Sequence, residues 1–141
     1  MKAIILAAGQ GTRMGAETEH KPKCMIEYRG QSLINHTIDT MRSCGINDIM
    51  IVNGYKKEVL ESHLSNEDVR FVTNKRYEKT NMVHTLFCAE SEMDDDLLIS
   101  YGDIIFSKNV LKQIIKNKNS FIVTVDKNWL DLWKIRMNNP L

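Results

Sequence analysis

The sequence predicts an α/β domain in which a doubly wound, mostly parallel sheet carries helices on both faces. The apolar run at residues 3–8 has no polar alternation, which is typical of a strand covered on both faces in the middle of a parallel sheet. Along the rest of the chain, runs of strand length alternate with segments whose apolar residues recur at helical spacing. That alternation predicts parallel strands joined by right-handed crossovers.

The first crossover is predicted to be a helix that begins after Ser32 and ends near Gly45. Serine is a favourable N-cap, and glycine readily takes the left-handed conformation that ends a helix. Between them lies an apolar stripe at helical spacing, formed by Leu33, Ile34, Ile38 and Met41.

The remaining elements continue the alternation. Strands are expected at residues 48–52, 69–73, 97–100 and 121–125, and helices at residues 58–64, 81–90 and 110–116. No Ser/Gly-rich linker interrupts them and the chain has only two prolines, so residues 1–141 are expected to form a single domain.

Composition argues against several classes of protein. Lysine and arginine total 19 and aspartate and glutamate 18, a balance that does not suit a sequence-independent nucleic-acid binder. No apolar run approaches the roughly eighteen residues that cross a bilayer, so membrane insertion is not expected. The three cysteines, Cys24, Cys44 and Cys88, lack metal-ligand spacing and fit a reducing, cytoplasmic setting.

The strongest motif directly follows the first strand. Glycines at the carboxyl end of a strand let the backbone bend tightly and turn successive N–H groups toward an anion. The spacing of Gly9, Gly11 and Gly15 differs from the dinucleotide fingerprint, and the Gly-Lys-Ser/Thr ending of a Walker loop is missing. We interpret this segment as a loop that binds nucleotide phosphates, with an ordinary tight turn as the alternative.

Two basic side chains favour the phosphate interpretation. Arg13 offers a rigid fork of donors to phosphate oxygens, and Lys23, which follows Pro22, offers a compact charge. The alternative for Lys21 and Lys23 is that they are solvated loop lysines.

Asp103 follows the fourth predicted strand, next to Gly102. Ligands of doubly wound sheets bind at the carboxyl ends of strands where the strand order reverses, so Asp103 is expected to face the glycine loop. A carboxylate beside a triphosphate suits Mg²⁺, which prefers oxygen ligands. A helix cap or turn residue is the alternative.

Together, residues 6–14, the pair Pro22 and Lys23, and the pair Gly102 and Asp103 resemble the signature of the nucleotidyltransferases that make nucleotide-activated sugars and alcohols. The resemblance covers essentially the whole chain and implies a Rossmann-like nucleotidyltransferase fold. It implies that the glycine loop surrounds the nucleoside triphosphate, that Lys23 contacts the α-phosphate and the incoming phosphate, and that Asp103 binds Mg²⁺.

Two further segments narrow the resemblance. Residues 74–86 are similar to the branch that uses CTP, which includes phosphocholine cytidylyltransferases, and this implies that Thr80 and Asn81 help to read the base. Residues 126–141 resemble a branch acting on phosphonates, or on glutamine phosphate in a capsular phosphoramidate pathway. Trp129 and Trp133 in that segment share a helix face, and simple packing of the two rings is the alternative.

The implied site has catalytic, nucleotide-binding and metal-binding members. Arg13 and Lys23 are the expected catalytic residues, and Asp103 is the expected Mg²⁺ ligand. The expected nucleotide-binding residues are Leu6, Ala7, Ala8, Gly9, Gly11, Thr12, Arg13, Lys23, Thr80, Asn81 and Gly102.

The implied reaction is the Mg²⁺-dependent transfer of CMP from CTP to a small phosphorylated acceptor (phosphoglutamine, phosphocholine or a phosphonate), for surface polysaccharide decoration. A phosphate nucleophile is already anionic near pH 7, so the site needs positive charge rather than a general base. Two alternatives stay open: a sugar-1-phosphate nucleotidyltransferase using UTP or dTTP, and a nucleotide-binding module that lacks catalysis.

In this family a second acidic Mg²⁺ ligand and much of the acceptor pocket come from a later segment, which does not follow within these 141 residues. The resemblance therefore implies the nucleotide-binding part of a larger domain. We expect an exposed apolar sheet edge, and with it self-association into a homo-oligomer.

Three smaller features have more than one interpretation. Cys24 adjoins Lys23, whose charge is able to lower a thiol pKa, but a structural, half-buried thiol is the favoured interpretation. Gly54 and Tyr55 either border the nucleotide or turn the chain into the next helix. The scattered histidines are expected at the surface or as caps: His20, His36, His63 and His84.

Overall fold

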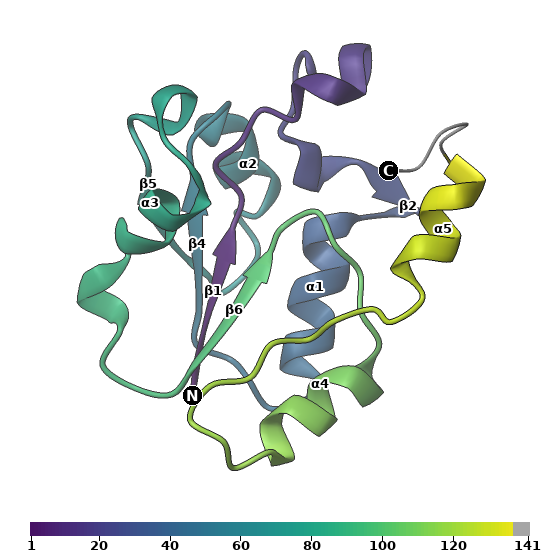
Figure 1. The fold of residues 1–141 in the computed structure, drawn as a ribbon. Helices are drawn as coiled ribbons and strands as arrows, with labels where there is room; N and C mark the ends of the chain where they lie inside the picture. The colour runs from purple at the N-terminus through teal and green to yellow at the C-terminus, as the bar shows by residue number, and fades with distance from the viewer. Residues whose placement is uncertain (137–141) are drawn as a thin grey trace.

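The computed structural model describes residues 1–136, in which four parallel strands form one sheet in the order β5-β4-β1-β6 (Figure 1). Their bounds are β1 (Lys2–Leu6), β4 (Ile49–Asn53), β5 (Arg70–Thr73) and β6 (Leu97–Tyr101). β1 is central, since Ile4 pairs with Met50 of β4 on one side and with Ile99 of β6 on the other. The first four predicted strands are confirmed, each within a few residues.

Helices cover both faces of this sheet, as predicted. α1 (Leu33–Arg42), α2 (Lys57–His63) and α4 (Lys108–Lys116) pack on one face, where Ile5 of β1 is buried. α3 (Met82–Phe87) and the turn after it lie on the other face, where Ile4 is buried with Ala89. Burial on both faces explains why β1 has no polar alternation.

The ends of α1 follow from the residues that flank it. The Ser32 hydroxyl accepts a hydrogen bond from the backbone N–H of Asn35, and Gly45 lies beyond the helix with a φ of 87°. The inward stripe at Ile34, Ile38 and Met41 is fully buried. These contacts confirm the predicted start and stop of the first crossover helix.

Several short elements go beyond the predicted alternation. β2 (Glu27–Tyr28) and β3 (Gln31–Ser32) form an antiparallel hairpin. A 3₁₀ segment kinked at Gly15 occurs at Thr12–Thr18, and single 3₁₀ turns occur at Lys23–Met25, Tyr77–Lys79 and Glu90–Glu92. The helix expected at 81–90 is shorter, because Asn81 caps α3 and the chain tightens into a 3₁₀ turn after Ala89.

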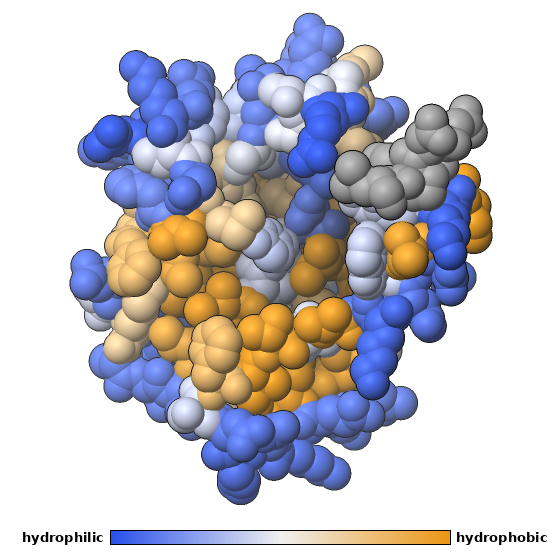
Figure 2. All heavy atoms as spheres, viewed as in Figure 1, coloured by the Kyte–Doolittle hydropathy of each residue, from blue (hydrophilic) through white to orange (hydrophobic). Residues whose placement is uncertain are grey.

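The predicted strand at residues 121–125 is wrong. In the described part of the chain these residues form no ladder, and Phe121, Val123 and Val125 are 83%, 65% and 68% exposed. Residues of this type become a strand only when a neighbour satisfies their backbone N–H and C=O groups, and within residues 1–136 β6 pairs with β1 alone. Figure 2 shows apolar side chains gathered on the face where Figure 1 places β6 and the segment after α4.

α5 (Trp129–Arg136) follows that segment. The rings of Trp129 and Trp133 pack edge to face with their centroids 6.1 Å apart, so the two side chains do share a helix face. Residues 137–141, the end of the segment that resembles the phosphonate and glutamine-phosphate branch, lie outside the described residues. No helix in residues 1–136 combines the length and apolar character needed to cross a bilayer.

Candidate active site

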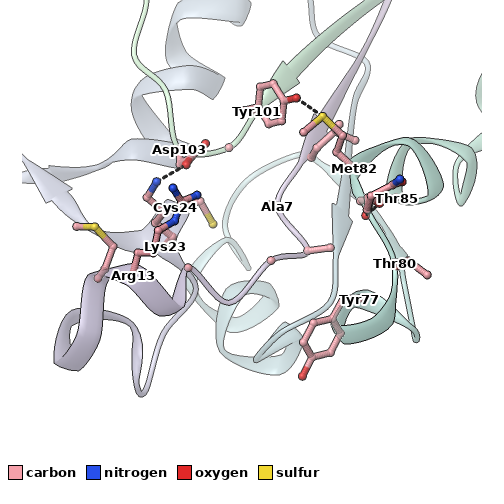
Figure 3. A pocket seen from close by; sticks show the side chains of 17 residues that line it. Ala7, Arg13, Lys23, Cys24, Tyr77, Thr80, Met82, Thr85, Tyr101 and Asp103 are labelled. Atoms are coloured by element: carbon pink, nitrogen blue, oxygen red, sulfur yellow. Dashed lines mark hydrogen bonds and ion pairs between the residues drawn. The ribbon is translucent and has the colours of Figure 1, made fainter. Parts of the chain in front are cut away.

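A cleft of about 620 Å³ opens at the carboxyl ends of β1 and β6 (Figure 3). The strand order reverses at β1, because the chain goes on to β4 and β5 on one side and returns to β6 on the other. Ligands of doubly wound sheets bind at such a point. The lining residues are Leu6, Ala7, Ala8, Gly9, Gly11, Arg13, Met14, Lys23, Cys24, Tyr77, Thr80, Asn81, Met82, Thr85, Tyr101, Gly102 and Asp103.

The cleft has two walls of different chemistry. We call the set Gly9, Gly11, Arg13, Lys23 and Asp103 the phosphate wall, and the lining residues between positions 74 and 85 the base wall. In Figure 3 the labelled side chains of Arg13, Lys23 and Asp103 lie on one side, and those of Tyr77, Thr80 and Thr85 lie on the other.

Gly11 allows the glycine loop to lie against Lys23. Its φ is 74°, and a Cβ at this position would lie 2.9 Å from Cβ of Lys23. The carbonyl oxygen of Gly11 accepts hydrogen bonds from the N–H of Met14 (2.9 Å) and from the hydroxyl of buried Thr18 (3.1 Å). The loop is therefore held in one shape by its own backbone and by a side chain beneath it.

Lys23 and Asp103 meet at the centre of the phosphate wall. Pro22 sets the backbone before Lys23, and the N–H of Gly102 donates to the carbonyl oxygen of Leu6 (2.9 Å), which fixes the chain before Asp103. Nζ of Lys23 lies 2.6 Å from Oδ2 of Asp103, and the two side chains are 36% and 32% exposed. A ligand in the cleft can reach both charges.

The donor set fits a magnesium ion shared with a substrate. Asp103 contributes a hard carboxylate oxygen, the ligand type that Mg²⁺ prefers. Among residues 1–136 no group of three or more His, Cys, Asp or Glu side chains gathers as a metal site. The other ligands would be phosphate oxygens and water, which is the usual arrangement for Mg²⁺ bound with a nucleotide.

The base wall is anchored by a residue that does not line the cleft. Asn74 is 1% exposed, and its Nδ2 donates to the hydroxyls of Thr80 (2.9 Å) and Thr85 (3.0 Å). Asn81 uses its Oδ1 to accept the N–H of His84 (3.1 Å) and so begins α3. These bonds order the wall without any charged group.

Gly54 lies between Ala8, which precedes the glycine loop, and Tyr77 of the base wall. A Cβ on Gly54 would lie 2.8 Å from the carbonyl oxygen of Ala8 and 2.9 Å from Cβ of Tyr77. Tyr55 donates its N–H to the same Ala8 oxygen (2.9 Å) and its hydroxyl to the carbonyl oxygen of Glu19 (2.6 Å). Of the two interpretations of this pair, the one supported is a turn packed beneath the site, because neither residue is among those lining the cleft.

The predicted site residues come together with one exception. All of them except Thr12 line the cleft, and their individual roles stay a prediction. The prediction missed six lining residues: Met14, Cys24, Tyr77, Met82, Thr85 and Tyr101. All six lie in or next to the segments that carried the resemblance. Extending the predicted site to all residues of those segments and their immediate neighbours would therefore have included them. The Tyr101 hydroxyl donates to Sδ of Met82, which joins the end of β6 to the base wall.

Cys24 is more deeply placed than the sequence suggested. It is 3% exposed rather than half-buried, and burial raises the pKa of its thiol to about 12, with the negative charge of Asp103 acting in the same direction. The hypothesis that Lys23 lowers this pKa is wrong, because the ammonium of Lys23 turns to Asp103.

Two of the histidines have structural contacts away from the cleft. His63 lies 2.8 Å from Oδ1 of Asn35, and His36 lies 2.7 Å from the carbonyl oxygen of Tyr28. The acidic run at residues 94–96 forms exposed ion pairs with the N-terminus and Lys2.

Comparison with known proteins agrees with this geometry. The sequence profile of the MobA-like NTP transferase domain matches residues 3–130. A CTP:phosphoglutamine cytidylyltransferase from Campylobacter jejuni is 43% identical over 100% of this chain and 58% of that protein. A UTP–glucose-1-phosphate uridylyltransferase from Haloferax volcanii is 35% identical over 84% of this chain and 49% of that protein.

Among solved structures, a CTP:phosphocholine cytidylyltransferase from Streptococcus pneumoniae matches with a TM-score of 0.69 and 34% identity. That match covers 77% of this chain and 49% of the other. The chain thus spans about half the length of the relatives that it matches.

Proposed function

This chain belongs to the MobA-like NTP transferases, and on that premise we propose that it transfers CMP from CTP to a small phosphorylated acceptor and releases pyrophosphate. The observation that carries the proposal is the phosphate wall, in which the glycine loop, Lys23 and Asp103 line one cleft. Preference for CTP is supported by two relatives whose names specify CTP.

The proposed reaction is an in-line displacement at the α-phosphorus of CTP. A phosphate oxygen of the acceptor forms the new bond to that phosphorus. The bond from the α-phosphorus to the oxygen bridging to the β-phosphorus breaks, and its electron pair leaves with pyrophosphate. Because the nucleophile is already an anion, the site has to position two anions and neutralise their charge.

The chain offers that neutralisation from several directions. The N–H groups of the glycine loop and the guanidinium of Arg13 donate to the phosphate chain, and Lys23 donates to the α-phosphate and the incoming phosphate. When bound at Asp103, Mg²⁺ supplies further positive charge to the phosphate oxygens. Lys23 is free to turn from Asp103 to the substrate, since both side chains are about one third exposed.

Glutamine phosphate is the first acceptor to test, because a CTP:phosphoglutamine cytidylyltransferase matches the whole chain at 43% identity. The proposal includes a cytoplasmic role in surface polysaccharide decoration. A second candidate is transfer of UMP from UTP to a sugar 1-phosphate, which the match to a uridylyltransferase favours.

The test is pyrophosphate release by the purified chain with Mg²⁺, with CTP or UTP, and with glutamine phosphate, phosphocholine, an aminoalkylphosphonate or glucose 1-phosphate. Release with CTP and one phosphate acceptor supports the proposal and names the acceptor. Release with UTP and glucose 1-phosphate alone favours the second candidate. Nucleotide binding without release from any pair would contradict catalysis by this chain.

A further inference from the structure

We propose that Asn74 is a positioning residue for base selection, whose buried amide fixes the Thr80 hydroxyl as a hydrogen-bond acceptor in the cleft. A fixed acceptor at this point selects a base with an exocyclic amino group, cytosine, over one with a carbonyl oxygen, uracil. The inference rests on the proposed function, since it places the base of the nucleotide against the base wall.

The orientation of the Asn74 amide follows from its neighbours. The backbone N–H of Arg76 lies 2.9 Å from Oδ1 of Asn74, and a backbone N–H can only donate. The opposite orientation of the amide would set two donors against each other. Nδ2 of Asn74 therefore faces the threonines, and its two N–H groups reach Thr80 at 2.9 Å and Thr85 at 3.0 Å.

This orientation fixes the polarity of both hydroxyls. A threonine hydroxyl has one donor and two acceptor positions, and Asn74 fills one acceptor position on each. The hydroxyl of Thr80 donates to the carbonyl oxygen of Arg76 (2.9 Å), and that of Thr85 donates to the carbonyl oxygen of Asn81 (3.1 Å). Each oxygen then has one lone pair left and no hydrogen to give to a ligand.

Thr80 is the member of the pair that meets the base. Both residues line the cleft, but Thr85 is only 6% exposed whereas Thr80 is half-buried. Its remaining lone pair accepts the 4-amino group of cytosine and repels the 4-carbonyl oxygen of uracil.

Asn81 adds a donor beside this acceptor. Its Oδ1 accepts the N–H of His84 at the start of α3, which fixes the orientation of the amide and leaves Nδ2 as the donor that the side chain offers to a ligand. Cytosine presents an amino donor at position 4 followed by acceptors at N3 and O2. On the base wall the Thr80 acceptor and the Asn81 donor match the amino group and N3 of cytosine. Uracil instead presents an acceptor at position 4 and a donor at N3, so both contacts are mismatched.

The inference is tested by the dissociation constants of magnesium-bound CTP and UTP, measured by isothermal titration calorimetry on this chain. The wild-type protein should bind CTP more tightly. Thr80→Val, which removes the acceptor at nearly constant volume, should lower the UTP-to-CTP ratio of dissociation constants about tenfold. Thr80→Ser, which keeps the hydroxyl, should restore most of the ratio.

Asn74→Leu should lower the same ratio of dissociation constants, although Asn74 does not line the cleft. In a Thr80→Val background, Asn74→Leu should lower the ratio little further, because both changes act through the Thr80 hydroxyl. Asn74→Ala replaces it if Asn74→Leu does not fold. Thr40→Val is the matched control. The Thr40 hydroxyl on α1 also donates to the carbonyl oxygen four residues earlier (2.8 Å) but lies outside the cleft, so its loss should leave the ratio unchanged.

The outcomes separate this inference from the proposed function. A wild-type preference for UTP, an unchanged ratio in Thr80→Val, or full additivity of the Asn74 and Thr80 variants would overturn the inference and leave nucleotidyl transfer standing. Failure of the wild-type chain to bind either nucleotide would overturn both.

Discussion

The two walls of the cleft are built in opposite ways. The phosphate wall exposes charge, with the Lys23–Asp103 pair about one third exposed at the end of β6. The base wall is neutral and is ordered from beneath by Asn74, which is 1% exposed. Under the proposed function, the charge of the phosphate wall meets a highly anionic ligand and has to be reachable, whereas the hydrogen bonds of the base wall distinguish two similar bases and have to be held in one orientation.

This contrast separates the expected consequences of substitution. On the phosphate wall, removing a group should lower the rate with either nucleotide. On the base wall, removing a group should change the ratio between nucleotides. Variants that cross this division would show that the walls do not work separately.

The largest effect is expected from the phosphate wall. Lys23→Ala and Arg13→Ala should each reduce turnover by about 10²-fold or more, because each removes a preorganised donor to charge that develops in the transition state. The UTP-to-CTP ratio should not move. The measurement is pyrophosphate release at saturating nucleotide, with circular dichroism to verify the fold.

Lys57→Ala is the control for this pair of variants. Lys57 begins α2 and lies outside the cleft, with its Nζ 3.9 Å from a carboxylate oxygen of the neighbouring, exposed Glu58. Its loss therefore removes a comparable surface charge away from the site. Wild-type turnover in Lys23→Ala would refute the proposed role of the phosphate wall.

The phosphate wall was predictable from sequence and the base wall was less so. Gly11, Arg13 and Lys23 belong to a local motif, and the rule for parallel sheets then brings Asp103 to the same edge. The role of Asn74 depends on the orientation of its amide. The backbone N–H of Arg76 and the hydroxyls of Thr80 and Thr85, which the fold brings together, decide that orientation. Residue types alone do not carry this information.

The same limit explains the wrong strand at residues 121–125. Its β-branched and aromatic residues favour an extended chain, but a strand also needs a partner, and the pairing is a property of the sheet rather than of the segment. β1 was predictable because its neighbours, β4 and β6, lie within the chain and its burial on both faces leaves a continuous apolar run.

A smaller effect is expected at Gly54, beside the base wall. Gly54→Ala would set a Cβ 2.8 Å from the carbonyl oxygen of Ala8 and 2.9 Å from Cβ of Tyr77, so the backbone at Ala8 or the base wall has to move. The free energy of unfolding should fall by about 1–3 kcal/mol, the usual cost of overpacking. Urea denaturation measures this cost. Gly9→Ala is the matched control, since a Cβ at Gly9 would meet no atom within 4 Å and should change stability little.

The smallest effect concerns the thiol beneath the phosphate wall. Thiolates rather than thiols react with iodoacetamide, and burial that raises the pKa of the Cys24 thiol to about 12 keeps it protonated at pH 8. Cys24 should therefore resist alkylation in the folded protein, while the partly exposed Cys44 and Cys88 react, as peptide mass spectrometry would record. Raising the pH toward 12 should increase labelling of Cys24 only as its thiolate forms. Labelling of Cys24 at pH 8 as fast as that of Cys44 would contradict the raised pKa and would mean that the charge of Lys23 does activate the Cys24 thiol.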